Sequence, residues 1–479
     1  MTNRFLGIAL AIITMTTNAQ NEIDALRYST HNLNGTARYT AMGGAFSSLG
    51  AEFSALSQNP AGIGMYQFSE ITFTPSFNLS VNKSYFNKSN LSAYKSAVAA
   101  SNLGIVFALP QNNSDWKRVN LGVGWNQLAN YENSIRIEGV NKESSIVDRI
   151  VEMTNGTLTG ELVNGVGNSY SQMAWNTYLI DPLFNNNGII DGEYTSNFSL
   201  NPKSQSKNIN SCGGMNEFIF SIGGSYKDKL YMGATIGIPT INYHEFSKYT
   251  ERELSDTSNN LRQMILSEEI SAYGTGYNLK VGAIYRLTEK IKIGGSLHTP
   301  TFFTIEENYN TSITTFFKDS TLDYSMGYLT PFKYDLITPY KAIISASTIF
   351  NNILISAEYE IIDYGSAKYF SSDFENENLT IESNYQQTEN IKIGAEFIIK
   401  PFVLRAGYSK YGSALASKDF SRENFSYGFG INNGVYFVDM SYIISQGSDE
   451  QLLYSEDNLS PIKIINTNHN LVFTIGFRY

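Results

Sequence analysis

The sequence is poor in cysteine and in charged side chains. Of its 479 residues, Cys212 is the only cysteine, so no disulfide can form within the chain. Lys and Arg number 34 against 44 Asp and Glu, which gives a formal net charge of −10. A nucleic-acid partner needs clustered basic residues, so this balance argues against one. Charged residues make up only 16% of the chain while aromatic residues reach 13%, a composition typical of a surface that meets lipid.

Long hydrophobic runs are also missing. The one apolar run, Phe5–Met15, follows Arg4, and small residues precede Gln20. This pattern predicts a secretory signal peptide over residues 1–19, with the mature chain starting near Gln20. The run is too short for a membrane-spanning helix, which needs about 20 apolar residues. We therefore expect a secreted chain that is periplasmic, outer-membrane or extracellular.

Catalytic and cofactor motifs are absent as well. The four histidines lie in no catalytic motif, and no Gly-Lys-Ser/Thr phosphate loop is present, so we expect neither an enzyme nor a bound cofactor. The segment Asp181–Asp191 faintly resembles a calcium loop but lacks its ligand spacing and closing Glu. An ordinary turn is the favoured interpretation there, a cation site the alternative, and no metal site is predicted. The histidines are His31, His244, His298 and His469.

What the sequence does contain is alternation of apolar and polar residues, most clearly at its end. From residue 471 onward every second residue is apolar or aromatic, and the last one is a tyrosine. A terminal aromatic after such a pattern resembles the signal that directs outer-membrane barrels to the barrel-assembly machinery. The residues of this predicted insertion signal are Leu471, Phe473, Ile475, Phe477 and Tyr479.

The same alternation recurs back to about residue 67. Strands with one apolar face and one small, polar or charged face fit lipid outside and a polar or filled lumen inside. We therefore predict an all-β fold, a 14-stranded antiparallel transmembrane β-barrel over residues 67–479. The predicted strands are 67–82, 102–110, 118–138, 216–227, 229–246, 276–288, 290–305, 339–350, 352–364, 390–399, 401–411, 424–432, 434–445 and 468–479.

The connections between these segments alternate in length. Short turns such as Asn432-Asn433-Gly434 alternate with long connections, a pattern typical of outer-membrane barrels with short periplasmic turns and long extracellular loops. The longest connection, 139–215, contains two predicted helices, Ser145–Thr154 and Ser169–Leu179. The predicted long connections are 83–101, 139–215, 247–275, 306–338, 365–389, 412–423 and 446–467.

Residues 20–66 do not alternate and precede the first strand. A disordered leader or a small periplasmic cap would fit, but the residues favour a plug inside the lumen. Ala37–Phe46, followed by Asn59-Pro60-Ala61-Gly62, resembles the N-terminal hatch of the FadL/TodX family of outer-membrane transporters for long-chain fatty acids and aromatic hydrocarbons. The family fold is a 14-stranded barrel with a small hatch, in agreement with the strand count. The predicted hatch motif consists of Gly43, Gly44, Asn59, Pro60, Ala61 and Gly62.

Two tripeptides, His298-Thr299-Pro300 and Gly237-Ile238-Pro239, are similar to a branch of the family found in Bacteroidetes. The resemblance also implies a kink in one strand, the third, that opens a lateral hole. Pro and Gly inside a strand weaken its ladder, although each could mark only a bulge or a strand end. The candidate kink residues are Gly122, Gly124, Asn126, Pro239 and Pro300, with Gly122–Gln127 as the first choice.

Alternation also places several cations in the lumen, where they could hold a ligand carboxylate. Lys280, Lys292, Lys392 and Arg405 are the candidates, and ion pairing with lumen carboxylates such as Glu358, Glu360, Glu396 and Asp439 is the favoured alternative for each.

Together these features predict a passive outer-membrane channel for hydrophobic small molecules such as long-chain fatty acids. The molecule would be captured on extracellular loops, diffuse through a hatched lumen and leave laterally. The expected partners are the hydrophobic ligand, outer-membrane lipid and lipopolysaccharide, and the assembly machinery, and the family precedent suggests a monomer. A general porin and a structural or adhesive barrel remain the alternatives, because the sequence does not identify the substrate.

Overall fold

The computed structural model describes residues 22–112, 114–142, 144–186, 188–198, 202–254, 260–327, 331–454 and 461–479. The predicted signal peptide lies outside these residues. Among the described residues, no helix combines the length and the apolar character that a membrane crossing requires.

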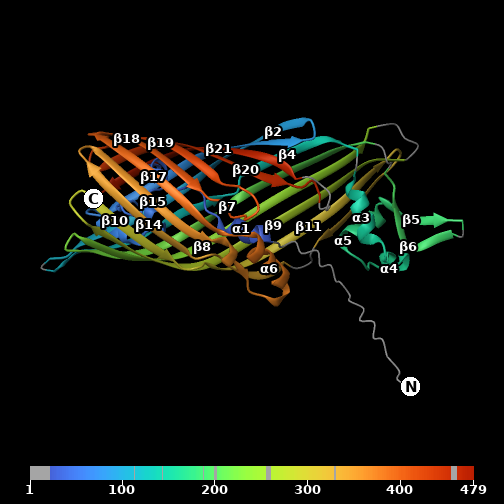
Figure 1. Ribbon diagram of the computed structural model, residues 1–479, viewed down its shortest axis with the longest axis horizontal. Coiled ribbons are helices and arrows are strands. Elements are labelled where there is room, and N and C mark those ends of the chain that lie inside the picture. The colour runs from blue at the N-terminus through green and yellow to red at the C-terminus, as the bar shows by residue number, and fades with distance from the viewer. Residues whose placement is uncertain are drawn as a thin grey trace, which may run out of the picture.

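The main feature of the fold is a closed antiparallel β-barrel of 14 strands, as predicted (Figure 1). The ladder runs from the first strand to the last, and the last strand pairs with the first through registers such as Phe73↔Ile475. Three of the 14 barrel strands are interrupted and consist of two pieces each, β3/β4, β10/β11 and β13/β14. The strands are β1 (Glu70–Phe86), β2 (Ser89–Pro110), β3 (Trp116–Asn130), β4 (Asn133–Asn141), β7 (Lys203–Tyr226), β8 (Leu230–Glu253), β9 (Leu261–Arg286), β10 (Ile291–His298), β11 (Phe302–Phe317), β13 (Phe332–Ile337), β14 (Lys341–Phe350), β15 (Ile353–Asp363), β17 (Gln387–Ile399), β18 (Phe402–Tyr411), β19 (Arg422–Asn432), β20 (Tyr436–Gln451) and β21 (Ile462–Arg478).

The two ends of the barrel differ. At the short-turn end, tight connections such as Asn351-Asn352 join the strands, as predicted. At the opposite, long-loop end the strands continue further than predicted, and the predicted long connection 83–101 is wrong because β1 and β2 form a hairpin with only Asn87 and Lys88 between them. Beyond the lipid-facing band both faces of a strand meet polar surroundings, so the alternation that marks a strand in the sequence disappears.

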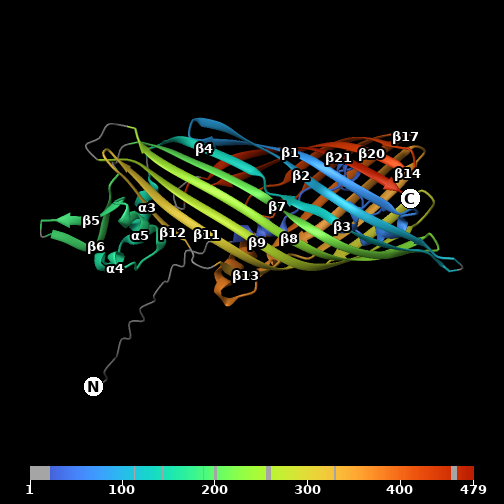
Figure 2. The same ribbon diagram turned by 180° about the vertical axis from the view of Figure 1, so that it is seen from behind.

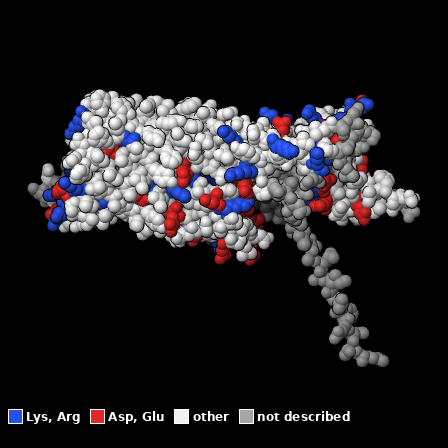
Figure 3. Space-filling view, turned by 45° about the horizontal axis from the view of Figure 1, so that its top comes forward, with Lys and Arg blue, Asp and Glu red and all other residues white. Residues whose placement is uncertain are grey.

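The outer face of the barrel is apolar near the short-turn end. Phe218, Phe220 and Ile222 on β7 are each about half exposed and point outward, and equivalent residues continue round the barrel. Aromatic side chains pair at the rim, for example Trp116 with Tyr226 at 5.5 Å between ring centroids. In the view of Figure 3 the upper part of the wall carries few charged side chains between the left rim and the middle of the molecule. An apolar band bounded by aromatics is the lipid-facing surface of a transmembrane barrel.

Helical elements gather at the long-loop end, beyond β4. The predicted helices there are confirmed as α3 (Ile146–Thr154) and α5 (Ser169–Asn176), and α3 begins where Ser145 forms a capping box with Asp148. Residues that join them form α4 (Thr159–Val163) and a hairpin of β5 (Ile180–Asn185) and β6 (Gly188–Ser196), so the segment that resembles a calcium loop forms part of a hairpin (Figure 2). The remaining elements are β12 (Thr321–Gly327), η3 (Tyr364–Ser366), β16 (Lys368–Tyr369), η4 (Ser372–Phe374) and α6 (Glu375–Asn384).

Residues 22–66, called the N-terminal segment below, lie inside the barrel. They contact the inner faces of strands all round the wall, from β3, β7, β8 and β9 to β18, β19, β20 and β21. Most of the segment is fully buried, with Phe46, Phe53 and Leu56 among its apolar anchors. It consists of α1 (Glu22–Ser29), α2 (Ala37–Ala41) and the two short helices η1 (Ser54–Ser57) and η2 (Pro60–Met65).

Candidate functional site

The barrel wall is interrupted between its second and third strands. The ladder of β2 and β3 runs from Pro110↔Arg118 to Asn102↔Asn126 and stops there, although β2 continues for 13 more residues toward Ser89. On its other side the third strand stays paired to β7, with a register shift between Gln127 and Ala129. From this point to the long-loop end, β2 has a free edge, called the wall gap below.

β4 does not fill the gap but lies against the inner face of the β1–β2 hairpin, which passes over it (Figure 1 and Figure 2). Side chains of the hairpin take the place of ladder hydrogen bonds: the Asn82 amide donates to the carbonyl of Ser134 at 2.6 Å, and the Asn87 amide donates to the carbonyl of Val140 at 2.8 Å. These bonds satisfy carbonyls of β4 that no neighbouring strand reaches, and so lower the cost of the departure of β4 from the wall.

The predicted kink residues lie at or near irregularities of the sheet. Gly122 and Gly124 belong to the paired part of β3 and face Ile63 and Phe53 of the N-terminal segment. Asn126 is the last residue of β3 paired to β2, so it marks the edge of the wall gap. Pro239 lies in β8 where pairing to β9 lapses between Gly237 and Thr240, and Pro300 lies between β10 and β11. Their role in ligand release remains a prediction.

The predicted hatch motif organises the N-terminal segment. Gly43 and Gly44 adopt φ of 65° and 77°, a backbone region that suits glycine, and form a tight turn after α2. Asn59 caps η2: its side chain accepts from the backbone N–H of Ala61 at 3.1 Å and donates to the carbonyl of Ser47 at 2.6 Å and to that of Ala283 on β9 at 3.3 Å. The buried amide of Asn59 therefore links η2 to Ser47, earlier in the N-terminal segment, and to the barrel wall.

Replacement of that amide should loosen the segment. We expect Asn59→Ala to lower the free energy of unfolding by about 1–3 kcal/mol, the cost of leaving its buried partners unsatisfied. Urea unfolding of the folded protein in lipid vesicles, followed by tryptophan fluorescence, measures the change. The matched control is Asn210→Ala on the exposed surface of β7, which should change the value by less than about 0.5 kcal/mol. Equal effects of the two substitutions would contradict this role of Asn59.

Sequence reasoning missed a belt of glycines on the inner wall. A Cβ at any of them would come within 3.0 Å of the N-terminal segment, so only glycine lets the backbone of the segment lie directly on the sheet. The available signal was glycine at inward-facing positions of successive strands, opposite outward apolar residues. This glycine belt comprises Gly104 and Gly124 against Phe53, Gly223 against Ile63, Gly233 against Pro60, Gly282 against Asn59, Gly294 against Ser47, Gly394 against Met42, Gly407 against Gly43 and Gly428 against Ala41.

The predicted lumen cations all point inward but already have partners. Lys280 bonds Glu217 at 2.5 Å, and Lys392 bonds Glu358 at 2.8 Å and Glu360 at 3.3 Å. The other two behave alike. Arg405 pairs with Glu396 at 2.6 Å and Asp439 at 2.5 Å, and Lys292 donates to the carbonyl of Leu49 at 3.0 Å.

The carboxylates of these pairs hold the N-terminal segment. Glu396 accepts a hydrogen bond from the side chain of Arg38 at 3.0 Å. Glu358 accepts one from the backbone N–H of Ser47 at 3.0 Å, and Glu217 accepts one from the hydroxyl of Ser57 at 3.0 Å. The wall cations therefore neutralise carboxylates that bind the segment, so a ligand carboxylate would have to displace an existing partner to bind them.

On the long-loop side of the N-terminal segment, the lumen contains connected cavities. The largest, about 860 Å³ and called the vestibule below, has many apolar and aromatic side chains, including Leu26, Tyr131 and Phe420. It shares Asn130, Asn468 and other residues with a narrower cavity of about 80 Å³, called the neck. The lining of the neck includes Asn130 at the end of β3, beyond the last residue of β3 that pairs with β2, Asn126. A molecule entering from the long-loop end therefore meets the vestibule first and then the neck.

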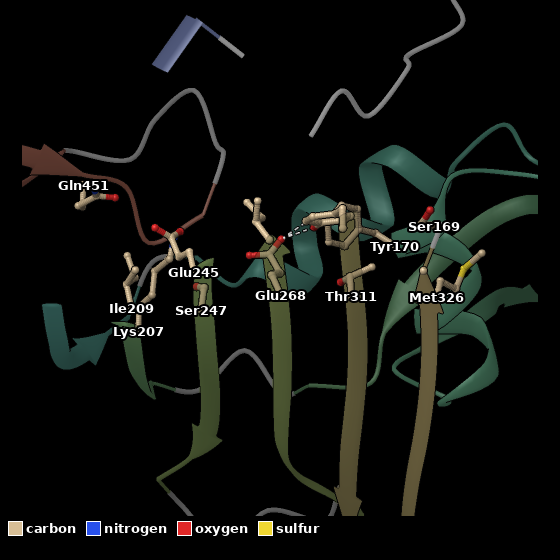
Figure 4. A pocket seen from close by; sticks show the side chains of 13 residues that line it. Ser169, Tyr170, Lys207, Ile209, Glu245, Ser247, Glu268, Thr311, Met326 and Gln451 are labelled. Carbon is tan, nitrogen blue, oxygen red and sulfur yellow. Dashed lines mark hydrogen bonds between the residues drawn. The ribbon is translucent and has the colours of Figure 1, made fainter. Parts of the chain in front are cut away.

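A third cavity, of about 470 Å³, lies beside the vestibule under α5, and Lys207 and Gln451 line both. Figure 4 shows Glu245 and Glu268 rising from neighbouring strands, with Tyr170 reaching toward Glu268. The hydroxyl of Tyr170 donates to Glu268 at 2.6 Å, and burial next to that carboxylate raises the pKa of Tyr170 well above its usual value. The described residues contain no group of three or more His, Cys, Asp or Glu that could hold a metal ion.

Comparisons with known proteins bear on the architecture. No protein-family model and no curated protein matches the sequence. Among solved structures, the toluene transporter TodX of Pseudomonas putida aligns with 94% of this chain and 99% of its own at a TM-score of 0.53 and 13% identity. A Pseudomonas aeruginosa FadL homologue aligns over the same shares at a TM-score of 0.53 and 12% identity. Identity this low establishes the architecture alone: the chain has the β-barrel fold of TodX and of this FadL homologue.

Proposed function

We propose that the protein is an outer-membrane channel through which small apolar or amphiphilic molecules pass from the long-loop end to the wall gap. The observation that carries the proposal is that the vestibule shares lining residues with the neck, and that the neck is lined by the end of β3 beyond its last pair with β2. The N-terminal segment closes the lumen below this path, so it acts as a hatch, and the way out is sideways through the wall.

The surroundings of the path support this assignment. The vestibule offers apolar and aromatic surface for a poorly soluble molecule, which would gain about 25 cal/mol for each Å² of apolar area removed from water. Passage down a concentration gradient needs no energy-coupling site. One of the similar solved structures is a toluene transporter, which agrees with an apolar cargo.

A general porin is the main alternative. A porin passes ions and sugars through a water-filled lumen, whereas here residues 22–66 contact the wall all round and are held by buried carboxylates and a glycine belt. The proposal therefore predicts little ion current through the intact protein.

Blocking the neck tests the proposal. Asn468 lines both the vestibule and the neck, and the next residue, His469, faces outward and stacks on Tyr442. We expect Asn468→Trp to reduce uptake of a radiolabelled long-chain hydrocarbon or acyl compound nearly to the level of cells without the protein, because an indole fills a cavity of about 80 Å³. The measurement is uptake by a Gram-negative host that lacks a channel of its own.

The matched control is His469→Trp, the same substitution one residue away on the outer face, which should leave uptake unchanged. Heat-modifiable migration on gels shows that both variants are folded. Normal uptake by a folded Asn468→Trp variant would contradict the proposed route.

A further inference from the structure

The neck differs chemically from the vestibule above it. Its lining is mostly carboxamides and hydroxyls, contributed by the N-terminal segment, β1, the end of β3 and the last three strands of the barrel. A passage for pure hydrocarbons needs no hydrogen-bonding groups, and burying them carries a desolvation cost. The polar lining residues are Asn32, Asn34, Asn78, Ser80, Asn130, Glu132, Arg422, Asn424, Ser445, Asn468 and Asn470.

Several of these groups have unused hydrogen-bonding capacity. Asn470 is 8% exposed, and its side-chain oxygen has no hydrogen-bond partner among the described residues. The side-chain nitrogen of Asn34 and the Nε of Arg422 are also buried without a partner among those residues. The neck therefore has an acceptor without a partner on Asn470 and donors without a partner on Asn34 and Arg422, so it suits a ligand that can donate as well as accept.

This requirement discriminates between head groups. A carboxylate only accepts hydrogen bonds and an ammonium only donates them, whereas a hydroxyl does both. The charges of the lining are also nearly balanced, since it contains one acid, Glu132, and one base, Arg422. Arg422 already donates to the carbonyl of His31 at 2.9 Å and lies 4.8 Å above the ring of Tyr411, while Glu132 pairs with Lys95 at 3.3 Å.

From the neck lining and the vestibule together, we infer that the cargo is an amphiphile with an uncharged, hydroxyl-rich head group, as in acylglycerols and alkyl glycosides. This inference rests on the proposed channel function and names its substrate class. The apolar vestibule accommodates the tail, and the carboxamides of the neck bind the head group as it approaches the wall gap. Asn424 and Asn470 are the residues we assign to head-group recognition, since both are buried and line the neck from the barrel wall.

Uptake of three matched radiolabelled probes tests the inference: 1-monodecanoylglycerol, decanoate and decane. Cells of a Gram-negative host that lacks its own channel are compared with and without the full mature chain. We expect the glyceride to enter fastest. Asn470→Leu and Asn424→Leu should each slow glyceride uptake about tenfold, which corresponds to about 1.4 kcal/mol, and leave decane uptake unchanged. The matched control is Asn90→Leu on the exposed side of β2, which should alter neither.

The possible outcomes separate the inference from the function on which it rests. Preference for decanoate, with loss of that preference in Arg422→Gln, would overturn the neutral head group in favour of an anionic one. In a liposome-swelling assay, entry of free glucose as fast as through a general porin would overturn the inferred head-group recognition and favour a water-filled pore. If the three ten-carbon probes enter at equal rates and the asparagine substitutions do not change these rates, head-group recognition is refuted, while the proposed channel function stands. Failure of all three to enter would contradict the channel itself, and the inference with it.

Discussion

Removal of residues 22–66 should convert the barrel from a closed channel into an ion-conducting pore. The wall of the barrel is complete below the wall gap, and the N-terminal segment occupies its lumen there. Barrels of 16–18 strands leave an aqueous channel while those of about eight are filled by side chains, so an emptied 14-stranded barrel has room for water. Planar-bilayer recordings should show steady currents for the deletion variant and none above background for the intact protein.

A point variant tests the same idea without deletion. Gly394 belongs to the glycine belt, and a side chain there would collide with Met42. We expect Gly394→Phe to push the segment off the wall and to cause intermittent current. Gly160 on α4 has open space around it, so Gly160→Phe is the matched control and should remain closed. If neither the deletion variant nor the Gly394→Phe variant conducts ions, although gel migration shows that both are folded, the N-terminal segment is not the barrier.

The second large effect concerns the buried charges. Lys392 is almost completely buried between Glu358 and Glu360, which are buried as well. Lys392→Met removes the ion-pair partner of Glu358, while Glu360 keeps Lys341 at 3.6 Å. Because a buried carboxylate then loses its cation, we expect the free energy of unfolding to fall by about 3–5 kcal/mol. Urea titration in lipid vesicles, followed by tryptophan fluorescence, gives the difference.

The same substitution at an exposed ion pair provides the control. Lys333 pairs with Glu306 at 3.0 Å, and both side chains are exposed. Lys333→Met should cost about 0–1 kcal/mol, since exposed pairs contribute little. If restoring neutrality with Glu358→Gln in the Lys392→Met background does not recover part of the lost stability, charge is not the cause.

The sequence predicted those parts of the fold in which one face of a strand meets lipid. Near the short-turn end, Ile391–Ile399 alternates because odd positions face the bilayer and even positions such as Lys392 face the lumen, and the strand count followed from this contrast. The extensions of β2 and β7 toward the long-loop end were missed because no lipid enforces alternation there. The break between β3 and β4 was also missed, since it depends on side chains of β1, such as Asn82, that are distant in sequence.

The sequence likewise predicted only part of the candidate site. Asn59 and the Gly43-Gly44 pair were singled out because they belong to a short motif that resembles the hatch of the FadL/TodX family, and the structure gives them a helix cap and a tight turn. The glycine belt and the neck were not predicted, because each consists of residues from many strands that are distant in the sequence. The cations Lys392 and Arg405 pair with carboxylates that the sequence already offered as partners, Glu358, Glu360, Glu396 and Asp439. The sequence did not indicate Glu217, the partner of Lys280.

The seam where the two ends of the barrel meet has a consequence for biogenesis. The pairing of β1 with β21 closes the barrel, and Ser69 and Tyr479 extend it by exchanging both backbone hydrogen bonds. The backbone N–H of Ala37 donates to Thr474 on that last strand, and Thr40 bonds Ser441 on the strand before it. The N-terminal segment can therefore make its final contacts with the wall only after β20 and β21 have been delivered.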